Sequence, residues 1–206
     1  MTVITIPSFL KSVMESAEIR LERTDFVMRS AYTRQRQVLA WHSGHMWKMS
    51  CPVPNLVEPQ SGEMRAFLAD MDGRVNTCQF PVPGYSGPAN GYSGTAGLVN
   101  GAGQSGYSID TDGWEASETV LPKGAYVNVG GELKLLTQPL VTNALGQGTM
   151  YFKPALRYSP PDNSVIVFNE PYAIMSMSDS NGAGWSLSAP RFHGFSLAFE
   201  EAVNVS

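Results

Sequence analysis

Polar and apolar positions alternate near the start of the chain, as they do in a half-buried β-strand. In residues 17–22 apolar side chains at odd positions are interleaved with charged ones, so one face of the segment is apolar. Two further runs, residues 36–40 and 45–51, flank the turn sequence Ser43-Gly44. The pattern predicts a first strand followed by a hairpin with an aromatic face.

A helical spacing follows this region. Ser61 is placed to cap a helix, and Gly73 is placed to end it. Between them, apolar residues recur at the i, i+3, i+4 and i+7 positions, namely Met64, Phe67, Leu68 and Met71. We therefore expect one helix with a single apolar face, and then a short strand over residues 75–81 that ends at a proline.

Glycine, serine and asparagine dominate residues 84–107, where the tripeptide Gly-Tyr-Ser occurs three times. Such a stretch buries too little apolar surface to offset its chain entropy. Long loops inside compact domains are uncommon and are often functional. The composition predicts a long loop or an extended arm over residues 84–112.

Short β-type segments at close spacing fill residues 113–173, and turn sequences separate them. The segments are residues 113–119, 126–129, 132–136, 149–152 and 165–168. This spacing predicts a small all-β module. Two more strands are expected after it, at residues 173–177 and 195–202.

The composition of the 206 residues excludes several classes of protein. Charged residues make up 16% of the chain, whereas soluble domains average roughly 25%. A formal charge of -4 argues against a nucleic-acid binder, which needs a basic footprint. Uninterrupted apolar runs are far shorter than the roughly 20 residues that cross a bilayer, and the first residues lack a secretion-signal pattern. We therefore expect no membrane insertion, and synthesis in a cytosol.

Candidate catalytic, metal and cofactor motifs are weak. Residues 101–106 match the letters of the dinucleotide fingerprint GxGxxG, but a strand-like sequence follows them instead of a helix. His42 and His45 flank the predicted turn and are interpreted as surface imidazoles. Cys51 and Cys78 are too few and too far apart for a disulfide framework or a zinc knuckle, so we expect buried thiols. No catalytic residue, metal or cofactor is predicted.

Aromatic residues are better candidates for a binding role. Three tyrosines, Tyr85, Tyr92 and Tyr107, interrupt the glycine-rich segment. Tyrosine is enriched at protein interfaces, so these side chains are candidate subunit contacts, with packing against their own domain as the alternative. A carbohydrate-binding module is a second possibility, for which the candidate stacking residues are Trp114, Tyr126, Tyr151 and Trp185.

The order of segments resembles that of distal tail proteins of long-tailed bacteriophages. One similar region has Trp47 and Met49 in a strand, then the helix with Ala66-Phe67-Leu68, then a Gly-Arg turn leading to Phe80. The later similarity lies in residues 121–131, 133–136, 148–157 and 165–171, which follow the pattern of small β modules in phage tail-tip proteins. Together the similar segments span most of residues 16–177.

The resemblance implies a mainly β fold with two parts. Residues 1–83 and 174–206 would form a ring-forming domain, a β-sandwich or split barrel with one packed helix, like tail-tube subunits. Residues 113–173 would form a small inserted β-barrel-like module, and residues 84–112 would connect the two.

The function implied is that of a non-enzymatic structural protein of the virion, assembled in the host cytoplasm. It would form a homo-oligomeric ring, usually of six copies, at the baseplate or tail tip, and would join the tail-tube protein to the hub that carries the receptor-binding apparatus. The alternatives are a major tail-tube subunit and a carbohydrate-binding module of the tail tip.

Overall fold

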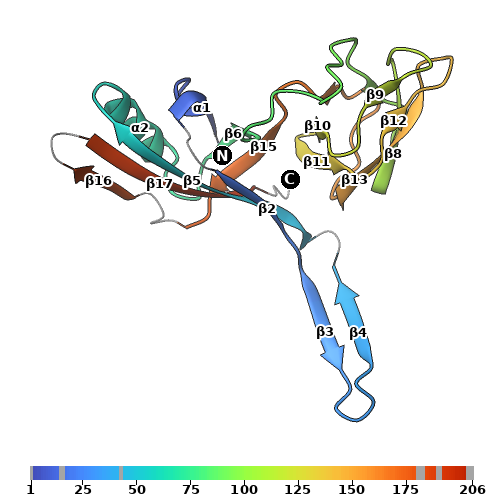
Figure 1. The fold of residues 1–206 in the computed structure, drawn as a ribbon, viewed down its shortest axis with the longest axis horizontal. Helices are drawn as coiled ribbons and strands as arrows, with labels where there is room; N and C mark the ends of the chain where they lie inside the picture. Colours follow the sequence, from blue (N-terminus) through green and yellow to red (C-terminus); the bar gives the residue numbers. More distant parts are fainter. Residues whose placement is uncertain (1, 14–16, 42–43, 180–183, 189–191, 203–206) are drawn as a thin grey trace.

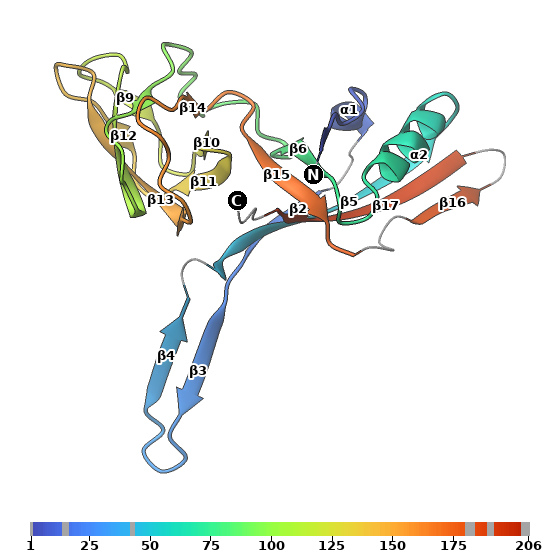
Figure 2. The same ribbon diagram turned by 180° about the vertical axis from the view of Figure 1, so that it is seen from behind.

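The computed structural model describes residues 2–13, 17–41, 44–179, 184–188 and 192–202 (Figure 1). The fold is mainly β, and two helices lie in this part of the chain, so the predicted fold class is confirmed. The strands form two units, a main sheet and a barrel-like sheet, and one hairpin projects away from both (Figures 1 and 2).

The main sheet has seven strands, six of which lie in the order β1-β6-β15-β17-β5-β2. β1 is parallel to β6, and the other neighbours on this path are antiparallel. The strands are β1 (Val3–Ile4), β2 (Glu18–Glu22), β5 (Met46–Leu56), β6 (Thr77–Pro81), β15 (Tyr172–Met177) and β17 (Phe192–Glu201). The seventh, β16 (Gly184–Ser188), pairs only with β17.

Helices α1 (Leu10–Val13) and α2 (Gln60–Asp70) contribute to the core on one face of this sheet. Met64, Phe67, Leu68 and Met71 are all buried there, as the helical spacing predicts. Ser61 does not cap the helix: the N-cap is Pro59, and Ser61 is buried within the first turn. The carboxylate of Glu58 instead accepts a hydrogen bond from the Gly62 amide at 3.1 Å.

The second unit is a six-stranded, nearly closed sheet in the order β14-β10-β11-β13-β8-β7. A bridge between Leu98 and Val165 brings its two edges together. Its strands are β7 (Leu98–Val99), β8 (Gly106–Asp112), β10 (Tyr126–Val129), β11 (Glu132–Leu136), β13 (Gly148–Leu156) and β14 (Ile166–Val167). A separate pair, β9 (Thr119–Leu121) with β12 (Leu140–Val141), packs its apolar residues into the same core. We call this second unit the barrel.

The barrel is inserted between two neighbouring strands of the main sheet. β6 and β15 pair directly, with Pro81 opposite Tyr172, so the chain leaves and re-enters the sheet at adjacent points. Residues 82–97 and 168–171 make the two connections. This insertion places two hydrophobic cores next to each other, one in each unit.

The prediction of a loop over residues 84–112 was wrong for its second half. β7 and β8 lie in that range, and β8 pairs along five positions with β13. The barrel therefore begins near Leu98, earlier than the predicted boundary at 113. The low apolar content of this stretch was misleading, because Ile109 and Val99 fill the barrel core while polar residues alternate with them.

The predicted hairpin around Ser43-Gly44 was also wrong. Strand β4 (Arg36–Ala40) pairs with β3 (Asp25–Arg29), and β5 pairs with β2 and β17. The true turn lies at residues 30–35, where the Ser30 amide donates to the Gln35 carbonyl and Arg34 adopts a positive φ. Nothing in the local pattern distinguishes this polar turn from the Ser-Gly pair.

Both cysteines are fully buried in the core of the main sheet. Burial raises the pKa of the Cys51 thiol to about 11 and that of Cys78 to about 12. Because the thiolate is the reactive form, we expect iodoacetamide at pH 8 to leave both residues unmodified in the folded protein and to label both in denaturant. Mass spectrometry of the alkylated protein measures this, and rapid labelling of the native protein would contradict the packing.

Candidate assembly surfaces

The projecting β3–β4 hairpin continues the edge of the main sheet. β2 leads into β3, and β4 leads into β5, so one long ribbon passes from the sheet into the hairpin. The last pair of the sheet part is Glu22 with Met46, and the first pair of the hairpin is Asp25 with Ala40. Between these pairs the outgoing strand has two residues and the returning strand has five. Thr24 stabilises the bend by accepting the Trp41 amide on its carbonyl oxygen and donating its hydroxyl to the Gly44 carbonyl.

Every residue of both hairpin strands is exposed, although several are large and apolar. Cross-strand partners share a face, so Phe26 and Leu39 lie together on one side with Met28. The exposed fractions of these three side chains are 57%, 44% and 43%. Val27 and Val38 form a second apolar pair on the opposite side. A two-stranded hairpin is at best marginally stable in water, so a ribbon that is apolar on both faces is a candidate contact with another molecule.

The hairpin is also the most basic part of the chain. Residues 23–40 contain four arginines and one aspartate, a net charge of +3 in a chain whose total is -4. The remaining residues therefore carry -7. Two of the arginines, Arg29 and Arg36, stand directly opposite each other near the tip, where like charges destabilise an isolated hairpin. Apolar area and positive charge together favour a partner surface that is both apolar and acidic.

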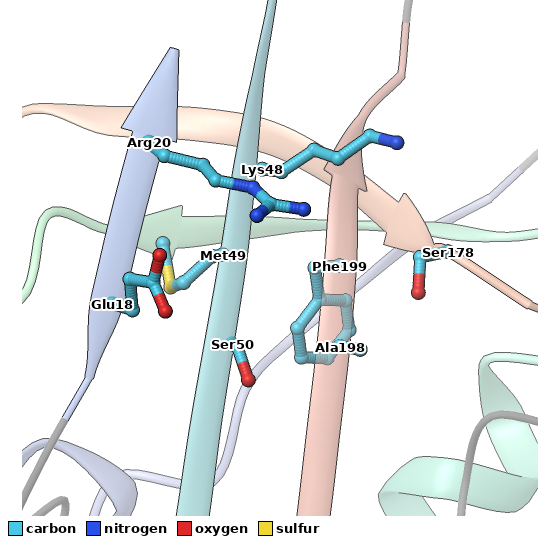
Figure 3. A pocket seen from close by; sticks show the side chains of 8 residues that line it. All are labelled: Glu18, Arg20, Lys48, Met49, Ser50, Ser178, Ala198 and Phe199. Carbon is cyan, nitrogen blue, oxygen red and sulfur yellow. The ribbon is translucent and has the colours of Figure 1, made fainter. Parts of the chain in front are cut away.

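The face of the main sheet opposite the helices is polar. Lys48 lies 2.7 Å from Glu22 and 3.8 Å from Glu200, which is 3.8 Å from Arg74. A hollow of about 360 Å³ lies on this part of the sheet (Figure 3), and its lining includes Glu18, Arg20, Lys48, Ser50, Ser178 and Ala198. Acidic and basic groups balance here, so the surface has no strong preference for an anion or a cation.

The three tyrosines proposed as subunit contacts are each half-buried against their own chain. Tyr85 packs edge-on against Tyr126 at a centroid distance of 5.3 Å, beside the core of the main sheet. Tyr92 contacts Phe168 and Trp114 in the barrel. The Lys153 ammonium lies 3.3 Å from the centroid of Tyr107. All three tyrosines therefore have contacts within their own chain, and a subunit contact through their exposed parts stays a prediction.

Three of the four residues proposed to stack on carbohydrate have described side chains, and their surroundings differ. Trp114 is 5% exposed, and its indole N–H donates to the Thr111 hydroxyl at 2.8 Å. Tyr126 is wedged between Tyr85 and Trp47. Tyr151 is exposed on the barrel, and the side chain of Trp185 lies outside the described residues. The prediction was wrong for Trp114, which is buried, while a stacking role for the partly buried Tyr126 and for Tyr151 stays a prediction.

The histidine prediction was wrong for His45, which is buried, and His42 lies outside the described residues. Within the described ranges, no group of three or more His, Cys, Asp and Glu residues is arranged to hold a metal ion. Residues 101–106 run directly into β8, as the strand-like sequence after them predicts, and not into a helix that could bind a pyrophosphate.

No protein-family model matches the chain, and no curated protein matches it. In the part of the chain that the structure describes, neither helix is long and apolar enough to cross a membrane. A function therefore has to be inferred from the surfaces themselves. The hairpin is the feature that sequence reasoning missed, because the polar residues 30–35 and the Ser43-Gly44 pair are both compatible with a turn.

Proposed function

We propose that this protein is a structural subunit that forms a closed homo-oligomeric ring at the distal end of a phage tail. The β3–β4 hairpin carries the proposal, because it presents apolar residues on both faces and extends beyond both folded units (Figures 1 and 2). In a ring, each subunit offers one surface to the next copy, and a projecting ribbon is well suited to such a heterologous contact.

The charge distribution supports a second copy as the partner of the hairpin. The hairpin carries +3 and the rest of the chain -7, so the hairpin of one subunit and the body of the next attract each other. The same complementarity repeats at every contact around a ring. The resemblance implies six copies. In a closed ring of six, the hairpin of each subunit would be covered by the next one.

The open polar face of the main sheet fits the wall of a channel. Its charged groups are paired with one another across β2, β5 and β17, and the net effect is close to neutral. A surface of this kind neither binds nor repels a passing polyanion strongly. The partners proposed along the channel axis are the tail-tube protein on one side and the tip hub on the other.

The test is the size and shape of the purified protein. Light scattering coupled to size-exclusion chromatography, followed by electron microscopy, is expected to show closed rings at micromolar concentration. A chain that stays monomeric at all concentrations, alone and with the tail-tube protein, would contradict the proposal. Electron microscopy of particles carrying labelled protein separates a tip ring from a tube subunit, because a tube subunit would be found along the whole tail.

A further inference from the structure

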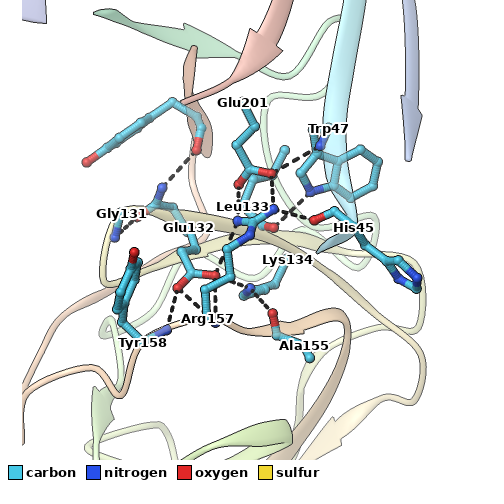
Figure 4. Close-up of polar contacts among 12 residues, drawn as sticks. His45, Trp47, Gly131, Glu132, Leu133, Lys134, Ala155, Arg157, Tyr158 and Glu201 are labelled. Atoms are coloured by element: carbon cyan, nitrogen blue, oxygen red, sulfur yellow. Dashed lines mark hydrogen bonds and ion pairs between the residues drawn. The ribbon is translucent and has the colours of Figure 1, made fainter. Parts of the chain in front are cut away.

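Four charged side chains are buried where the barrel meets the main sheet. The exposed side-chain fractions are 0% for Lys134, 6% for Arg157, 12% for Glu132 and 3% for Glu201. Two are bases and two are acids, so the cluster is neutral as a whole (Figure 4). Glu201 ends the last strand of the main sheet, and the other three belong to the barrel.

Arg157 joins the two units. Its guanidinium donates to both carboxylate oxygens of Glu201, with Nη1–Oε1 at 3.0 Å and Nη2–Oε2 at 2.7 Å. This two-point geometry fixes the orientation of the guanidinium plane as well as its position. Nη2 also donates to the carbonyl of His45, at the base of the β3–β4 hairpin. One side chain of the barrel thus contacts the end of β17 and the start of β5.

Each partner of Arg157 is held in place from its own side. The Glu201 carboxylate accepts the backbone amide of Trp47 at 3.0 Å. On the barrel side, Glu132 accepts the backbone amides of Arg157 and Tyr158 and the Lys134 ammonium, the last at 2.6 Å. Lys134 donates in addition to the carbonyl of Ala155 at 2.8 Å. Burial lowers the pKa of Lys134, and the charge of Glu132 opposes that shift.

Apolar contacts surround this cluster but do not by themselves set an angle between the units. Leu133 and Leu135 of β11 pack against the core of the main sheet, and Tyr126 meets Trp47 edge-on at 5.8 Å. Burial of apolar surface is itself non-directional. One directional contact lies beside it, since the Trp47 indole N–H donates to the Leu133 carbonyl at 2.9 Å. Charged hydrogen bonds are directional, and a buried charge displaced from its partner is strongly disfavoured.

We propose that the buried Glu132–Lys134–Arg157–Glu201 cluster is a clamp that holds the barrel and the base of the hairpin in one fixed orientation on the main sheet. Two chain connections alone would allow the units to move, as inserted domains commonly do. The clamp removes this freedom before assembly, so that the hairpin and the barrel are positioned in the single chain. This property does not depend on ring formation.

The test is the distribution of distances between the two units in the full chain. Spin labels on A66C, in the exposed face of α2, and on A144C, in an exposed barrel turn, report this distance by double electron–electron resonance. The native cysteines are buried and do not compete for the label. Dilution with unlabelled protein removes distances between copies. We expect a single narrow distribution in the parent protein, and a broad or bimodal parent distribution would overturn the proposal without any further variant.

Glu201→Gln and Arg157→Met are expected to widen the distribution by about twofold or more, because the units then behave as tethered domains. The matched control is Glu200→Gln, which changes the neighbouring residue of the same strand on the open face and should leave the distribution narrow. If Arg157→Met does not fold, the test rests on Glu201→Gln, because glutamine keeps the shape of the glutamate side chain. Circular dichroism confirms that each unit is intact, and unchanged width in folded Glu201→Gln would show that the other contacts between the units, which include apolar packing and the Trp47–Leu133 hydrogen bond, set the orientation without the cluster.

Discussion

Replacing Phe26 and Leu39 together by serine is expected to abolish ring assembly while leaving the monomer folded. The two side chains face each other on one side of the β3–β4 hairpin and are about half exposed, so the monomer loses little by their removal. If a neighbouring copy covers the exposed half of each side chain, each contributes about 0.8–1.5 kcal/mol to the contact. The double variant then weakens every subunit contact by about 10- to 150-fold.

The measurement is the fraction of protein in rings as a function of concentration, by light scattering and electron microscopy. Leu145→Ser is the matched control, since Leu145 is an exposed apolar residue, 77% accessible, on a barrel turn away from the hairpin. The control should assemble like the parent protein. Rings formed equally well by the double variant would show that the hairpin is not a subunit contact.

Trp47→Ala is expected to cause a large loss of stability. Trp47 is 3% exposed in the core of the main sheet, and its indole N–H donates to the Leu133 carbonyl of the barrel at 2.9 Å. Truncating a buried tryptophan costs about 3–5 kcal/mol. Because whole domains are stable by only about 5–15 kcal/mol, the variant is expected to be largely unfolded well below the melting temperature of the parent.

Trp47→Phe separates the two contributions of this residue. Phenylalanine keeps most of the apolar volume but leaves the Leu133 carbonyl without its donor, so we expect a smaller loss of about 1–2 kcal/mol. Urea unfolding followed by circular dichroism measures both variants. Equal losses for alanine and phenylalanine would show that the hydrogen bond across the units, and not the packing, dominates the role of Trp47.

The periodic patterns identified several elements correctly. The apolar spacing of Met64, Phe67 and Leu68 predicted α2, and most short segments of the barrel were found as strands. The cap was not, because proline at position 59 and the carboxylate of Glu58 occupy the places assigned to Ser61. Caps depend on the path of the chain before the helix, which residue type alone does not specify.

The functional surfaces were predicted less well. The tyrosines and Trp114 were selected because they lie in glycine-rich or β-type sequence, yet each finds a contact within its own chain. The hairpin was missed because its strands were paired wrongly, and pairing decides which apolar side chains remain exposed. The cluster around Arg157 could not be inferred either, since its four residues come from β11, β17 and the end of β13.

The sequence by itself determined the mainly β class, the helix, the two buried thiols and the low charge, because these follow from composition and from contacts between residues a few positions apart. Only the tertiary structure decided which strands pair, that the barrel is inserted between β6 and β15, and that a basic apolar hairpin stands clear of both units. Lys134 illustrates the reason. In the sequence of β11 it looks like any charged residue of a strand. Its burial is possible only because its ammonium donates to Glu132 and to the Ala155 carbonyl, beside the neighbouring unit. Pairing and burial depend on residues far apart in the chain, so local periodicity cannot specify them.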